Sequence, residues 1–198
     1  MTTHAHKHHE SHQSGRAAWL RAAVLGSDDA IVSTASLMLG VAAASASREA
    51  ILTAGVAGLV AGAMSMAAGE YVSVSSQRDA EHADIEREKR ELLSAPEAEI
   101  AELAAIYRSR GLDHTLAMQV AEQLTKHDHL GAHLRDELGL APEALAQPLQ
   151  AALISAASFA ASAVLPIAAL LVAPAEVRAL TIVSFSIASL AALGAHGG

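Results

Sequence analysis

Four long stretches of this sequence contain no Asp, Glu, Lys, Arg or His. They cover residues 30–47, 51–69, 148–175 and 179–195. A helix needs about 18 to 20 residues to cross the hydrocarbon layer of a bilayer, and each stretch is close to that length or longer. We therefore predict an all-α integral membrane protein with four spans. A signal peptide is the rival interpretation of the first stretch, but two aspartates at its start and a second apolar stretch soon after it argue against that.

The composition excludes several classes of function. Hydrophobic residues make up 52% of the chain and aromatic residues only 3%, which is unusual for a water-soluble core. The net charge of −8 argues against nucleic-acid binding. With no cysteine, thiolate metal ligands and disulfides are absent. The sequence has neither a Gly-rich phosphate loop nor a recognisable Ser/His/Asp arrangement, so we expect no enzyme and no organic cofactor.

The chain divides into four predicted segments. Residues 1–15 are a disordered, His-rich tail, which either collects metal weakly or is only a polar terminus. Residues 16–74 contain spans one and two, residues 75–147 form a soluble domain of three amphipathic helices, and residues 148–198 contain spans three and four. Because Lys and Arg concentrate before the first span and within 78–135, we predict that the N-terminus and the soluble domain face the cytoplasm. The expected location is the bacterial cytoplasmic (inner) membrane.

Helix boundaries within the soluble domain follow from local signals. Pro96 in a first turn, with Ser94 as N-cap and Glu97 three residues later, predicts a helix stop and restart. Gly111 predicts the end of the next helix, and Asp113 or Thr115 predicts the cap of the third.

Ionisable groups border the first two spans. Asp28 and Asp29 begin the first span, and Glu70 lies at the inner end of the second, one turn after Met66. Carboxylates are costly to bury in a bilayer, so they usually mark an ion path or a proton relay. The alternative is that the aspartates cap a helix and Glu70 reaches the interface. The thioether of Met66 is a soft ligand suited to Fe²⁺, although ordinary apolar packing is the commoner fate of methionine.

The soluble domain carries carboxylates at helical spacing. Glu88 and Glu91 share a helix face, and Glu99 and Glu102 repeat their three-residue step after Pro96. Two such pairs on consecutive antiparallel helices can form a cage for a divalent cation. The alternative is a solvated face, on which neighbouring basic side chains neutralise the glutamates.

The third predicted helix contains further candidate ligands. They are imidazoles and carboxylates: His127, Asp128, His129, His133, Asp136 and Glu137. Imidazole together with carboxylate is a normal mixed ligand set for Fe²⁺, Mn²⁺ or Zn²⁺. We therefore predict that His133, Asp136 and Glu137 contribute to the metal site.

Three motifs resemble the vacuolar iron transporter family: VLGSDDAIVST at 24–34, AGAMSMAAGEY at 61–71 and ELGL at 137–140. The resemblance extends from Trp19 to the end of the chain. It implies a homodimer in the lipid bilayer that moves Fe²⁺, and often Mn²⁺, out of the cytosol in exchange for protons. It also implies that Asp29 and Met66 line the translocation path near the dimer axis.

The same resemblance implies a cytosolic metal-binding domain. Its ligands match Glu88, Glu91, Glu99, Glu102 and Glu137, and His133 lies close to where some members have methionine.

Two departures from the family pattern stand out. Ala30 replaces a usual glycine, and four spans are predicted where the family has five, so the chain is either a shortened product or works without the last span. The predicted function is Fe²⁺ or Mn²⁺ export by proton antiport. The alternative is a membrane-anchored metal-binding or sensing protein without transport activity.

Overall fold

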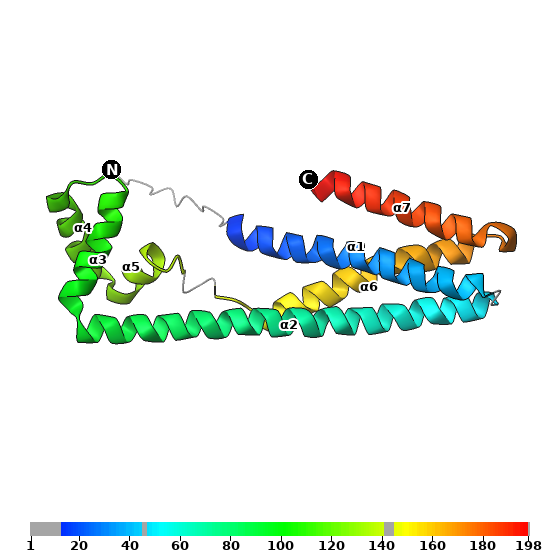
Figure 1. Ribbon diagram of the computed structural model, residues 1–198, viewed down its shortest axis with the longest axis horizontal. Coiled ribbons are helices and arrows are strands. Elements are labelled where there is room, and N and C mark those ends of the chain that lie inside the picture. The colour runs from blue at the N-terminus through cyan, green and yellow to red at the C-terminus, as the bar shows by residue number, and fades with distance from the viewer. Residues whose placement is uncertain (1–12, 45–46, 141–144, 198) are drawn as a thin grey trace, which may run out of the picture. The chain divides into compact units, whose positions relative to one another are not determined.

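The computed structural model describes residues 13–44, 47–140 and 145–197, and the side chains between Val24 and Ala195 except at 45–46 and 141–144 (Figure 1). Within these ranges every regular element is a helix. The elements are α1 Gln13–Ala43, α2 Arg48–Ser94, α3 Pro96–Ser109, α4 His114–His127, α5 His129–Asp136, α6 Pro148–Val172, the short 3₁₀ helix η2 Ala175–Val177 and α7 Arg178–Gly197. Most of the predicted His-rich tail lies outside the described residues, and its last residues begin α1.

Four of these helices are long and apolar enough to cross a bilayer. Among the described residues they are Val24–Ala43 of α1, the apolar part of α2, α6, and Ala175–Ala195 of η2 and α7. The predicted all-α membrane fold with four spans is confirmed. Helix α2 is 47 residues long, so the second span and the first predicted helix of the soluble domain are one continuous helix.

The chain forms two compact units. Residues 1–71 and 149–198 make the membrane unit, and residues 72–148 make the acidic unit. In the membrane unit, Met38, Ile51, Leu170 and Ile182 are buried against one another, which joins α1, α2, α6 and α7. Arg48 at the start of α2 donates hydrogen bonds to the carbonyls of the last turn of α6. Those carbonyls have no partner within their own helix, so the guanidinium satisfies them.

A second contact in the membrane unit depends on a glycine. A Cβ atom at Gly62 of α2 would lie 2.0 Å from the ring of Phe159 on α6. Phe159 is 1% exposed and packs with Ala30 and Ala163. The two helices therefore approach closely only because Gly62 has no side chain.

We expect Gly62→Ala to destabilise the membrane unit. Forcing extra carbon into a packed core typically costs about 1–3 kcal/mol, and the Phe159 ring has little room to move. The measurement is the unfolding midpoint of the purified protein in detergent. Gly69→Ala is the matched control, since a Cβ at Gly69 of the same helix meets nothing within 4 Å. Equal midpoints for the two variants would show that the Gly62 contact is unimportant.

The acidic unit is built from the charged end of α2 with α3, α4 and α5. Leu103, Ala117, Ala121 and Ala132 are fully buried and join the last three helices. Pro96 occupies the first turn of α3, as predicted. The predicted Ser94 cap is wrong, because the N-cap residue is Ala95 without a side-chain hydrogen bond. The Ser94 hydroxyl instead donates to the carbonyl of Glu91.

Turn residues end and restart the remaining helices. Gly111, with a φ of 105°, follows α3 in the left-handed region that only glycine enters easily. The Asp113 carboxylate accepts from the backbone N–H groups of Thr115 and Leu116, so it caps α4.

The third predicted helix of this unit is two helices. Asp128, with φ −149° and ψ 83°, separates α4 from α5. Its carboxylate accepts a hydrogen bond from Gly131 N at 3.1 Å, and its other oxygen pairs with Arg135. A Cβ at Gly131 would lie 2.1 Å from that carboxylate, so the sharp cap requires glycine there. The break places His133 on a short helix of its own, with Glu137 as the C-cap residue directly after it.

Candidate metal centre and membrane pocket

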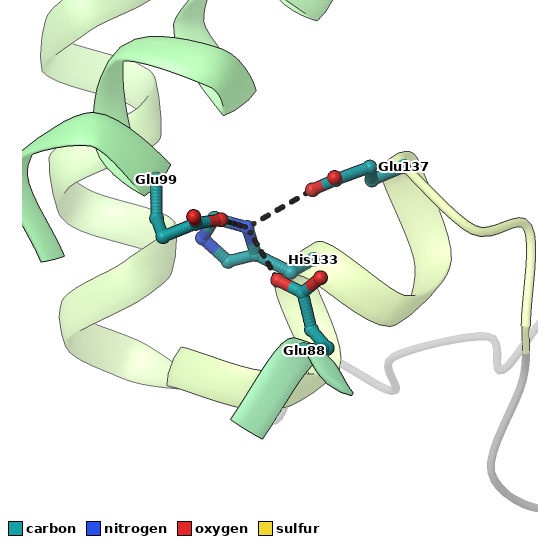
Figure 2. A group of neighbouring side chains, drawn as sticks. All are labelled: Glu88, Glu99, His133 and Glu137. Atoms are coloured by element: carbon teal, nitrogen blue, oxygen red, sulfur yellow. Dashed lines mark hydrogen bonds and ion pairs between the residues drawn. The ribbon is translucent and has the colours of Figure 1, made fainter. Parts of the chain in front are cut away.

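Four side chains from three helices converge in the acidic unit (Figure 2). Glu88 comes from α2, Glu99 from α3, His133 from α5, and Glu137 directly follows α5. One potential ligand atom from each lies within 4.8 Å of those of the others. We call this group the four-residue centre.

His133 occupies the middle of the four-residue centre. Its Nδ1 lies 3.2 Å from Glu88 Oε1, 3.3 Å from Glu137 Oε2 and 3.9 Å from Glu99 Oε2 (Figure 2). The exposed fractions of His133, Glu88 and Glu99 are 0%, 2% and 7%. Such burial is rare for charged side chains unless they are paired or hold a cation.

Local sequence directs these ligands inward. Leu92 is buried one turn after Glu88, and Leu103 is buried one turn after Glu99, so each glutamate shares a face with an apolar anchor. Glu137 N donates to the His133 carbonyl at 2.9 Å, which holds these two residues one turn apart.

Charge in the four-residue centre is unbalanced. Burial, followed by the charge of Glu137, raises the pKa of Glu88 to about 7. Burial and the charge of Glu102 raise the pKa of Glu99 as well. The pKa of Glu137 is also raised, mainly by its burial. All three carboxylates are therefore destabilised in their charged form.

Several buried polar atoms of the centre lack a hydrogen-bond partner. They are Glu88 Oε1, Glu99 Oε2 and His133 Nε2. A divalent cation would satisfy the unpaired carboxylate oxygens and neutralise the excess negative charge. Three carboxylates and one imidazole suit Fe²⁺, Mn²⁺ or Zn²⁺, so the donor set fits such an ion.

The other predicted ligands of the acidic unit lie elsewhere. Glu91 and Glu102 are exposed and outside the four-residue centre, although their charges raise the pKa of Glu99. Asp136 points to the C-terminal end of α3, where Tyr107 and the C-cap residue Arg110 donate to it. His129 is exposed, with its ring 6.4 Å from that of His133.

Asp136 is ionised by its neighbours. Burial acts to raise its pKa, but the hydrogen bonds from Tyr107 and Arg110 outweigh burial and hold the pKa below its usual value. Burial, together with the hydrogen bond that Tyr107 donates to Asp136, raises the pKa of Tyr107 to about 12. Sequence spacing does not reveal Tyr107 or Arg110, because both lie more than 25 residues from Asp136.

Metal affinity of the four-residue centre should rise with pH. A cation competes with the proton on Glu88, whose pKa is about 7. We expect the dissociation constant for Mn²⁺ to fall roughly tenfold between pH 6 and pH 8, as one carboxyl group loses its proton. Calorimetry on the detergent-solubilised protein, repeated in buffers of different ionisation enthalpy, measures both the affinity and the protons released.

The stability of the metal-free protein should change in the opposite direction. The folded state binds a proton at Glu88 more tightly than the unfolded chain does, so stability decreases as pH rises from about 5 to about 7. Thermal unfolding with a chelator present measures this stability. Mn²⁺ affinity that is constant between pH 6 and pH 8, with no proton released, would contradict the affinity prediction.

In the membrane unit, Asp29 and Met66 line one pocket of about 340 Å³. The side chains of Leu37 and Phe159 contribute to its wall, and small residues complete it: Ser33, Gly58, Ala61, Gly62 and Ser65. Of the three predicted path residues, Glu70 is half-buried and does not line this pocket. Asp28 is half-buried and also lies outside it. Phe159 is a pocket residue that no sequence pattern indicated.

Comparison with known proteins shows the family. The model of the VIT family matches residues 20–198. The chain belongs to the VIT family. The resemblance drawn from the motifs at 24–34 and 61–71 is confirmed, and with it a helical membrane protein.

Individual VIT relatives match different lengths of the chain. It is 47% identical to the vacuolar iron transporter of Acanthamoeba castellanii over 160 residues, which are 80% of this chain and 58% of the amoebal protein. It is 68% identical to vacuolar iron transporter homolog 3 of Oryza sativa over 68 residues, 34% of this chain and 27% of the rice protein. The chain therefore spans less than two thirds of the length of these relatives.

Proposed function

We propose that this VIT family member transports Fe²⁺, and also Mn²⁺, out of the cytosol in exchange for protons. The observation that carries the proposal is the pocket in which the Asp29 carboxylate and the Met66 thioether face the same space. A carboxylate supplies the charge that a partly dehydrated cation needs, and a thioether favours borderline ions over Mg²⁺ or Ca²⁺. The names of the relatives support iron as the transported ion.

The functional protein is proposed to be a homodimer in the bacterial cytoplasmic membrane. Asp29 is exposed in the single chain, and a second copy beside it would shield the pocket from lipid. The distribution of Lys and Arg supports a cytoplasmic N-terminus and a cytoplasmic acidic unit. The four-residue centre then faces the compartment from which the ion is removed, where it collects or senses the same ion.

Transport into proteoliposomes tests the proposal. Liposomes with an acidic interior should accumulate ⁵⁵Fe²⁺ when they contain the protein, and collapse of the proton gradient should stop the uptake. Protein-free liposomes give the background. Metal binding without uptake above this background would favour the alternative, a membrane-anchored metal-binding or sensing protein.

A further inference from the structure

Asp136 is fixed at three points by Tyr107 of α3 and by Arg110, the C-cap residue directly after α3. Tyr107 Oη donates to Asp136 Oδ2 at 2.6 Å, and Arg110 Nη1 donates to Oδ1. Arg110 Nη2 donates to the backbone carbonyl of Asp136 at 3.3 Å. The guanidinium lies 5.4 Å from the centre of the Tyr107 ring, so the two donors also contact each other. We call Tyr107, Arg110 and Asp136 the Asp136 cluster.

The Asp136 cluster joins two helices that carry ligands. Helix α3 presents Glu99 two turns before Tyr107. Asp136 is the last residue of α5 and the chain neighbour of Glu137, whose carboxylate lies 3.3 Å from His133 Nδ1. Arg110 holds both the side chain and the backbone of Asp136. It therefore restricts the backbone position of the next residue, Glu137.

Repulsion within the four-residue centre makes such a hold necessary. Glu99 on α3 and Glu137 after α5 are like-charged groups that approach the same imidazole nitrogen. Without a cation they push α3 and α5 apart, whereas the Asp136 cluster pulls the same two helices together by an ion pair and hydrogen bonds. Ligands kept at the correct spacing before the ion arrives bind it more tightly.

We infer that Tyr107, Arg110 and Asp136 are positioning residues of the metal centre. They contact no ion themselves, since both carboxylate oxygens of Asp136 accept hydrogen bonds from Tyr107 and Arg110. They set the distance between Glu99 and the His133–Glu137 pair, and through it the affinity and the coordination geometry. This inference rests on the proposed function of the centre as a metal site.

The test uses the whole protein in detergent and three readouts, one of which is the unfolding midpoint. Calorimetry gives the dissociation constant for Mn²⁺, and the visible absorption of bound Co²⁺ reports coordination geometry. Tyr107→Phe removes one hydroxyl without changing charge, and Asp136→Asn keeps the side-chain shape. We expect each to weaken Mn²⁺ binding about threefold to tenfold and to change the Co²⁺ spectrum.

Glu86→Gln is the matched control for Asp136→Asn. It also removes one carboxylate of the acidic unit and breaks an ion pair, the exposed one with Lys89. Its affinity and Co²⁺ spectrum should equal those of the wild type. Should Tyr107→Phe fail to fold, the shape-preserving Asp136→Asn variant decides the question with the same readouts.

Three results would overturn the inference. One is wild-type affinity and spectrum in both cluster variants. Another is a lower unfolding midpoint with an unchanged Co²⁺ spectrum, which would assign the cluster a structural role alone. The third is a wild-type protein that binds neither ion, which would refute the metal centre itself and so is distinguishable from the first two.

Discussion

Asp29→Ala should reduce Fe²⁺ uptake in proteoliposomes to the level of protein-free liposomes. Asp29 carries the only formal charge among the described residues that line the membrane pocket. This carboxylate can bind a partly dehydrated cation in place of water, and it can also accept a proton that moves in the opposite direction. Alanine can do neither. Mn²⁺ binding to the acidic unit should be unchanged, because the four-residue centre is made entirely of residues 88–137.

Asp28→Ala and Met66→Ala are the comparisons for this prediction. Asp28 does not line the pocket, and its side chain leaves the helix about 100° away from that of Asp29. Loss of Asp28 should therefore reduce activity much less. Met66→Ala should lower uptake mildly and change the preference between Fe²⁺ and Mn²⁺, since a thioether discriminates between ions more than it supplies charge. A larger defect in Asp28→Ala than in Asp29→Ala would show that Asp28, and not Asp29, is the carboxylate of the transport path.

The double variant Glu88→Gln/Glu99→Gln should lose metal binding in the acidic unit. It removes two of the three carboxylates of the four-residue centre while keeping side-chain size. The number of charged ligands tunes divalent affinity over several decades, so we expect the dissociation constant for Mn²⁺ to rise at least about a hundredfold. Calorimetry on the full-length protein measures it.

The same double variant should be more stable than the wild type when metal is absent. Both glutamates are buried and have raised pKa values, so their charged forms oppose folding at pH 8. Thermal unfolding in the presence of a chelator tests this. Glu86→Gln/Glu97→Gln, two exposed glutamates on the same two helices, is the control and should change neither quantity. Unchanged Mn²⁺ affinity in Glu88→Gln/Glu99→Gln would place the ion elsewhere.

Sequence spacing identified the members of the four-residue centre only in part. It grouped Glu88 with Glu91 and Glu99 with Glu102, but three-residue steps define a broad helix face and not its exact direction. That direction is set by burial of Leu92 and Leu103, which turns Glu88 and Glu99 inward and leaves their partners exposed. Only tertiary packing distinguishes the two members of each pair.

Asp136 shows a second limit of sequence reasoning. Its place on the third predicted helix suggested another ligand, whereas its partners are Tyr107 of α3 and Arg110 directly after α3. The break at Asp128 was missed for a related reason, because aspartate is tolerated within a helix and caps one only when the next turn offers free N–H groups. The four spans, in contrast, follow from apolar length alone.

The short distance along the chain between the outermost ligands has a consequence for biosynthesis. All members of the four-residue centre lie between Glu88 and Glu137, before α6 begins at Pro148. Contacts between residues near in sequence form early, since little loop entropy opposes them. On the ribosome, the acidic unit can therefore close around an ion while α6 and α7 are still being translated.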